Sequence, residues 1–184
     1  MEPAKVRRVV TGHDDTGKAI VLFDSYEPHS VARPGGGKTH LFWGTPQTPA
    51  AIDGPADRAL AHPPGIPPAA NGSVFRIVDF PPLTDDDIAK LDVNFMSSQI
   101  EHSSHATSSK YRPSTHPFMH RTRTVDYAVV MSGETDMLLD EGQSIHLKAG
   151  DVLIQQGTNH AWVNRSGDWC RIAFILIDAV DPFG

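Results

Sequence analysis

Histidine and carboxylate side chains gather in the second half of the chain. Four of the ten histidines fall within residues 102–120, and they are His102, His105, His116 and His120. Asp126 and His160 follow further along the chain. Imidazole and carboxylate groups bind divalent metals and exchange protons near neutral pH. The clustering therefore indicates a metal or acid–base site. For His102, His105 and His116 the alternative is a polar loop with solvated imidazoles.

The spacing between His120 and Asp126 sets a geometric condition on any shared ion. A straight strand rises roughly 3.3 Å per residue, which would place the two about 20 Å apart. We therefore expect the chain to turn within residues 121–125. The alternative is that Asp126 only hydrogen-bonds in a closed barrel mouth and His160 is a core residue.

The elements that must position these side chains are short strands. Turn-forming residues bound six runs with strand character, at residues 125–132, 135–139, 144–147, 152–156, 160–164 and 170–178. Many short strands at such spacing are typical of a sandwich or barrel, so an all-β fold is predicted. Alternation places His160, Trp162 and Asn164 on one strand face, with Trp162 as a possible cavity wall. Tyr127 should face away from Asp126.

The first half of the chain carries fewer signals. Residues 6–11 and 18–24 predict a hairpin, and residues 40–43 and 74–80 predict two further strands. Thr84 followed by three aspartates predicts the start of one short helix. Residues 28–72 should be mostly loop, because nine of the 15 prolines lie between Pro46 and Pro82. Residues 97–117 are also predicted to be a loop.

Composition limits the classes of protein to consider. The 184 residues are 39% hydrophobic and carry a formal charge of -6, which favours one soluble domain over residues 1–184 and disfavours nucleic acid as a partner. The single cysteine, Cys170, is expected to be a packing residue and allows no internal disulfide. No apolar run is long enough for a signal peptide or membrane span, so a cytoplasmic location is predicted. Residues 172–177 lack alternation, which predicts that both strand faces are covered and favours a homodimer.

Two stretches together resemble the conserved motifs of the cupins. Residues 120–133 begin with His120 and end in Gly133, like the first motif, and residues 150–164 run from Gly150 through His160 to Asn164, like the second. Cupins commonly bind a divalent metal through two histidines and a glutamate of the first motif and a histidine of the second. Here Thr122 stands at the second histidine position and Asp126 at the glutamate position.

The resemblance implies a cupin jelly-roll barrel, also called a double-stranded β-helix, with an N-terminal strand extension and one short helix. Residues 118–178 would form the conserved core, and residues 1–82 would supply N-terminal strands and Pro/Gly-rich loops. Of the cupin ligands, His120, Asp126 and His160 remain, a set of two histidines and one carboxylate that leaves positions open for substrate or dioxygen. The resemblance implies that these three residues would hold Fe, Mn, Ni or Zn and act as catalytic residues. Thr122, Trp162 and His116 would line the substrate pocket.

The sequence is most similar to small cupins that resemble cupin-domain oxidoreductases of polyketide pathways. This similarity implies a metal-dependent oxidoreductase or dioxygenase that acts on a small aromatic or polyketide-like molecule. Two alternatives stay open. One is a lyase or isomerase, such as a dehydratase or decarboxylase, and the other is a non-catalytic cupin that binds a small molecule.

Overall fold

The computed structural model describes residues 2–26, 29–52, 54–59, 67–91, 106–107 and 116–181. Nearly all regular structure in these ranges is β-strand. In chain order the elements are β1 (Arg7–His13), β2 (Ala19–Tyr26), β3 (His29–Ala32), the 3₁₀ turn η1 (Pro34–Gly36), β4 (Lys38–Thr45), β5 (Ser73–Phe80), α1 (Asp85–Ala89), β6 (Ala106–Thr107), β7 (Arg121–Thr122), β8 (Thr124–Ser132), β9 (Glu134–Leu138), the 3₁₀ turn η2 (Asp140–Gly142), β10 (Ser144–Lys148), β11 (Val152–Gln156), β12 (Ala161–Val163) and β13 (Cys170–Asp178).

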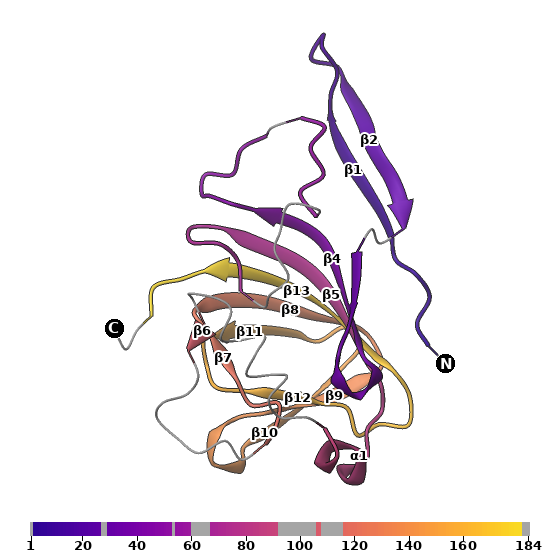
Figure 1. Ribbon diagram of the computed structural model, residues 1–184, viewed down its shortest axis with the longest axis vertical. Helices are drawn as coiled ribbons and strands as arrows, with labels where there is room; N and C mark the ends of the chain where they lie inside the picture. Colours follow the sequence, from indigo (N-terminus) through magenta and orange to yellow (C-terminus); the bar gives the residue numbers. More distant parts are fainter. Residues whose placement is uncertain are drawn as a thin grey trace.

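Two antiparallel sheets face each other and form the jelly-roll barrel (Figure 1). The larger sheet has the strand order β11-β8-β13-β5-β4-β3, and the smaller one has the order β10-β9-β12. All six strands predicted over residues 125–178 are present within one or two residues of their expected limits. The prediction of an all-β cupin-type barrel is therefore confirmed.

The core lies between the two sheets. Alternate residues of β8 point inward, so that Ala128 and Val130 are buried while Tyr127 is exposed as predicted. Ile172 and Leu176 of β13 are almost fully buried and belong to the same hydrophobic cluster. Cys170 is buried beside them, and burial raises the pKa of its thiol to about 12. The side chain is therefore a packing residue, as expected.

The first half of the chain widens the larger sheet. β5 pairs with β13, β4 pairs with β5, and β3 pairs with β4, all antiparallel. β4 confirms the strand predicted at residues 40–43 and extends it to Lys38–Thr45, whereas β3 lies in the part of residues 28–72 that was predicted to be loop. Strand pairing overrides the weak local signal there, because His29–Ala32 has an antiparallel partner in β4. The predicted hairpin is present as β1 and β2, which pair with each other and project beyond β4 (Figure 1).

A capping box fixes the start of the short helix. The Thr84 side chain accepts a hydrogen bond from the Asp87 backbone N–H, and the Asp87 carboxylate accepts one from the Thr84 backbone N–H. Ile88 then packs with Ala161 and Val163 of β12. The predicted helix is therefore confirmed, and it anchors the segment that follows β5. No helix in the described ranges has the length and apolar character needed to cross a membrane.

Part of the predicted loop over residues 97–117 lies outside the described residues. Residues 92–105 and 108–115 are not described, so His102 and His105 cannot be placed. Residues 106–107 form β6, which pairs with β7.

Candidate active site

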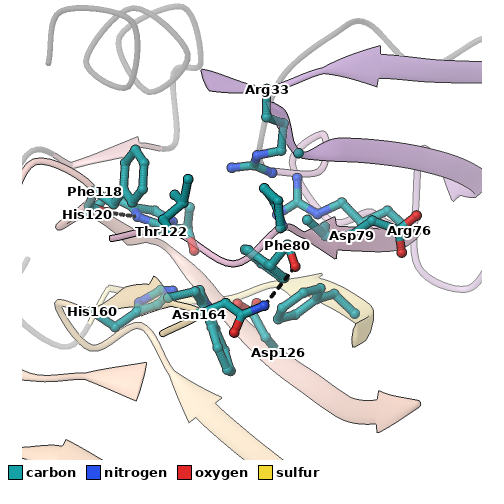
Figure 2. A pocket seen from close by; sticks show the side chains of 16 residues that line it. Arg33, Arg76, Asp79, Phe80, Phe118, His120, Thr122, Asp126, His160 and Asn164 are labelled. Atoms are coloured by element: carbon teal, nitrogen blue, oxygen red, sulfur yellow. Dashed lines mark hydrogen bonds between the residues drawn. The ribbon is translucent and has the colours of Figure 1, made fainter. Parts of the chain in front are cut away.

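A partly enclosed cavity lies between the two sheets at one end of the barrel. Both the first and the second half of the chain contribute to its wall, as Figure 2 shows. Its described lining residues are Arg33, Gly37, Arg76, Val78, Asp79, Phe80, Pro81, Leu83, Phe118, His120, Thr122, Asp126, His160, Trp162, Asn164 and Phe174. Five of the six residues predicted for the site are in this set, and His116 is not.

The two predicted histidines lie side by side in the cavity wall. His120 and His160 exchange both backbone hydrogen bonds, each with an N···O distance of 2.9 Å. Their ring centroids are 4.5 Å apart. This antiparallel bridge brings together two residues that are 40 positions apart in the chain, as the resemblance implied. A small ligand or ion can therefore contact both rings at once.

Burial keeps both imidazoles neutral. It lowers the pKa of His120 well below its usual range, and the neighbouring His160 adds to the shift. Burial also lowers the pKa of His160 to about 4. His120 Nδ1 lies 2.8 Å from the Phe118 carbonyl oxygen, drawn as a dashed line in Figure 2. Because a carbonyl only accepts, Nδ1 of His120 carries the proton and Nε2 keeps its lone pair.

Two groups compete for Nδ1 of His160. The Thr158 carbonyl oxygen lies 2.9 Å away and the Gln155 side-chain nitrogen lies 2.7 Å away. When Nδ1 carries the proton and donates a hydrogen bond to the Thr158 carbonyl, Nε2 keeps its lone pair. When Gln155 donates to Nδ1, Nε2 carries the proton instead. The neutral ring can thus serve as a proton acceptor or as a proton donor.

Asp126 lies in the same cavity as a buried carboxyl. Burial raises its pKa to about 6, although the hydrogen bond from Thr124 and the charge of Arg76 act in the opposite direction. Its Oδ1 has no hydrogen-bond partner among the described residues. The chain bends at Arg123, between β7 and β8, and the buried hydroxyls of Thr122 and Thr124 are 2.7 Å apart. Asp126 can therefore exchange a proton near neutral pH.

The described residues supply two metal ligands rather than three. The two histidines present neighbouring nitrogens, which fit a divalent ion. Within the described part of the chain, however, no three histidine, cysteine, aspartate or glutamate side chains are close enough to hold one ion. Asp126 shares the cavity with the histidine pair but does not complete a three-ligand set. The predicted ligand set of His120, Asp126 and His160 is not assembled in this conformation, and its metal binding stays a prediction.

Aromatic rings form much of the remaining wall. Trp162 packs edge-on against His160 and Phe174, with ring centroids 6.1 Å and 5.3 Å away. His160, Trp162 and Asn164 all line the cavity, as their spacing predicted. His116 is buried and packs on the ring of Phe118, with centroids 5.5 Å apart. His116 therefore contacts a residue of the cavity wall but does not itself line the cavity.

Sequence reasoning missed two arginines in the cavity, Arg33 and Arg76. A signal for Arg76 existed, because it has the same strand parity as the buried Val74 and Val78 of β5. A charged residue on the inward face of an apolar strand indicates a functional or paired group. No comparable signal marked Arg33, because it lies in the segment predicted as loop.

Comparison with known proteins extends these observations. No family model matches the chain. Over 181 residues the chain is 34% identical to phomopsin biosynthesis cluster protein C′ of Diaporthe leptostromiformis, covering 94% of this chain and 78% of that protein. Over 186 residues it is 27% identical to the cupin-domain-containing oxidoreductase fogC of Aspergillus ruber, covering 98% and 76% of the two chains.

A solved structure, that of a Cupin 2 conserved barrel domain protein from Salinispora arenicola, aligns with a TM-score of 0.35 at 14% identity, over 58% of this chain and 64% of that one. The relatives match nearly the whole chain, and the barrel carries the histidines of both cupin motifs at adjacent positions. The chain therefore belongs to the cupin superfamily, with relatives among fungal biosynthesis-cluster proteins and cupin-domain oxidoreductases.

Proposed function

We propose that the protein is a cupin-type oxidoreductase that acts on a small aromatic or polyketide-like molecule in the barrel cavity. The observation that carries the proposal is the pair of buried, neutral histidines, His120 and His160, set in an aromatic wall. Relatives named as cupin-domain oxidoreductases support the reaction class. The aromatic side chains of Trp162 and Phe174 support a flat, apolar substrate.

The chain's own groups would bind the substrate and manage its protons. The aromatic wall excludes water from the substrate skeleton, while His120 Nε2 offers a lone pair toward the cavity. Asp126, with a pKa of about 6, holds or releases a proton near neutral pH. A divalent ion of the kind cupins bind would supply redox chemistry and a position for dioxygen if it is Fe, Mn or Ni, and would act as a Lewis acid if it is Zn. The two histidine nitrogens are the ligands that this chain offers it.

Metal content and oxygen uptake test this proposal together. We expect the purified protein to contain a divalent metal and to consume oxygen with at least one member of a panel of phenols and aromatic acids. His120→Ala and His160→Ala should lose the metal and the activity. The control is His146→Ala, an exposed histidine that pairs with Asp136 on the smaller sheet. Full activity in metal-free wild-type protein would contradict the metal-dependent form of the proposal.

A lyase or isomerase is the second candidate, and a specific observation favours it. Asp126 and the neutral histidines can move a proton without any metal, and the described residues do not assemble a three-ligand site. Such an enzyme, for example a dehydratase or decarboxylase, would convert its substrate without consuming oxygen. Product formation in a sealed, oxygen-free cell would identify this candidate, and a strict need for oxygen would exclude it.

A further inference from the structure

Two arginines share the cavity with the histidine pair. Arg76 points inward from β5 and is only 8% exposed. Arg33 reaches the same cavity from the segment between β3 and η1 and is partly buried. Figure 2 shows both guanidinium groups across the cavity from Asp126. The cavity therefore carries two positive charges in surroundings where water contributes little to their solvation.

Neither arginine has a carboxylate partner among the described residues. The guanidinium of Arg76 has no hydrogen bond or ion pair there, and its buried Nε lacks any partner. Arg33 donates one side-chain hydrogen bond, to the Thr39 hydroxyl at 2.9 Å. Burial lowers the pKa of each arginine to about 10, which leaves both charged at neutral pH. An unpaired buried cation destabilises a fold, so its presence needs a reason.

The nearest acidic side chains do not neutralise the two arginines. Asp79 accepts two hydrogen bonds from Arg171, at 2.6 and 2.7 Å, and lies 2.9 Å from Nε2 of His40. Its charge is therefore already balanced by Arg171 and its oxygens are occupied. Asp126 interacts electrostatically with Arg76 but forms no ion pair with it. Because the histidine pair is neutral, the described cavity has an excess of positive charge.

We propose that Arg33 and Arg76 bind a carboxylate group of the substrate, and that its apolar body packs against Trp162 and Phe174. Guanidinium groups bind carboxylates through strong charge-assisted hydrogen bonds, and a dry cavity strengthens them. The rest of the molecule then extends toward His120 and His160. The substrate class is thus a small organic acid with an apolar, preferably aromatic, body. This inference rests on the proposed function of the same cavity and deepens it by naming the charge of the substrate.

Binding of benzoate and of benzamide to the full-length protein tests the inference. The two probes have the same shape and differ in charge, and removal of metal with a chelator prevents the carboxylate from binding a metal ion. Calorimetry at constant ionic strength should show that benzoate binds about tenfold or more tightly than benzamide. Equal affinities, or no binding of benzoate, would overturn the inference.

Variants assign the charge preference to these two residues. Arg76→Met and Arg33→Gln should each lose most of the preference for benzoate, whereas Arg76→Lys should keep part of it. Arg7→Gln should keep all of it, because Arg7 is exposed on the hairpin and pairs with Asp24. A preference that survives in both Arg76→Met and Arg33→Gln would contradict the assignment.

Thermal unfolding separates a ligand-binding role from a structural one. If Arg76 serves the ligand, Arg76→Met should leave the ligand-free protein equally stable or more stable, because an unpaired buried charge is removed. A structural arginine would instead lower the unfolding temperature. If Arg76→Met does not fold, the role is structural, and Arg33→Gln still measures the charge preference. Oxygen uptake decides the oxidoreductase proposal separately, since benzoate binding needs neither metal nor turnover.

Discussion

The ionisable side chains of the cavity respond to pH in opposite directions. Burial lowers the pKa of His160 to about 4, so the unfolded state binds its proton first and acidification from about pH 6.5 destabilises the fold. Burial raises the pKa of Asp126 to about 6, so the folded state binds that proton first and acidification stabilises the fold. Between pH 4 and 6 the two contributions oppose each other.

Removing the Asp126 charge should leave the histidine contribution to the pH dependence of stability unopposed. In metal-free protein, Asp126→Asn should become more stable relative to wild type as pH rises from 4 to 7, because the wild type then ionises a buried carboxyl. The raised pKa of Asp126 corresponds to a change in the free energy of unfolding of about 3 kcal/mol, at about 1.4 kcal/mol per pKa unit. Urea unfolding across this pH range measures the difference. Asp86→Asn, in an exposed part of α1, should follow the wild-type curve, and a constant difference for Asp126→Asn would contradict the argument.

At the residue scale, strand alternation and the positions of the two motifs predicted many of the residues that line the cavity. Strand alternation correctly placed His160 and Trp162 on the inner face and Tyr127 outside. The expected turn within residues 121–125 is present as a bend at Arg123, but the distance from Asp126 to the histidines could not be predicted, because it depends on the backbone path through that bend and not on residue type. Arg33 could not be predicted either, since its position depends on long-range pairing of β3 with β4.

Tight turns between strands hold the barrel elements in register. Gly133, between β8 and β9, has φ of 72°, and a Cβ placed on it would lie 2.2 Å from the Trp169 carbonyl oxygen. Gly142, in η2 between β9 and β10, has φ of 77° and open space around it. The two glycines share a backbone conformation but differ in surroundings. Substitutions at the two glycines therefore distinguish the cost of backbone strain, which both share, from the cost of close packing, which affects Gly133 alone.

Alanine substitutions at these two turns should give different losses of stability. Gly142→Ala should lower the free energy of unfolding by about 1 kcal/mol, the cost of a left-handed conformation. Gly133→Ala should lower it by about 3 kcal/mol or more, because the β8–β9 turn must also move away from Trp169. Chemical denaturation of the two variants measures both values. Equal losses would show that the turn adapts without strain.

At the scale of helices and strands, local sequence signals predicted whether a segment is a helix or a strand better than they predicted which strands pair. The capping residues Thr84 and Asp87 marked the helix, and turn residues marked the strands between residues 124 and 178. β3 is short and was not predicted from its own residues, and among the described residues it is supported by its pairing with β4. Sheet order is set by contacts between distant segments, which single-sequence patterns do not contain.

The outer face of the larger sheet is apolar over several neighbouring strands. Its exposed side chains are Phe75, Tyr127, Val129, Met131, Val152, Ile154 and Ile175. Ile154 and Ile175 flank Tyr127 at directly paired positions on adjacent strands, so the patch is continuous. The expectation that both faces of β13 are covered therefore holds only for the inner face within this single chain. A second copy packed face to face on a two-fold axis would bury matching apolar surfaces.

A charge introduced into this face should prevent the predicted homodimer. We expect wild-type protein to have the mass of a dimer in light scattering coupled to gel filtration. Tyr127→Lys or Ile154→Lys should give a monomer that remains folded. Val21→Lys, at an exposed position of β2, should remain dimeric. A monomeric wild type, or a dimer that persists in both face variants, would contradict this use of the face.

The cavity combines residues from two separate stretches of the chain. Arg33 comes from the segment between β3 and η1 and Arg76 from β5, whereas His120 and His160 come from the second half of the chain. Selection can therefore alter the N-terminal stretch to admit a new substrate while the histidine pair stays intact. Related cupins could diversify in this way, and exchanging residues 29–80 between two homologues would transfer substrate preference without transferring the chemistry.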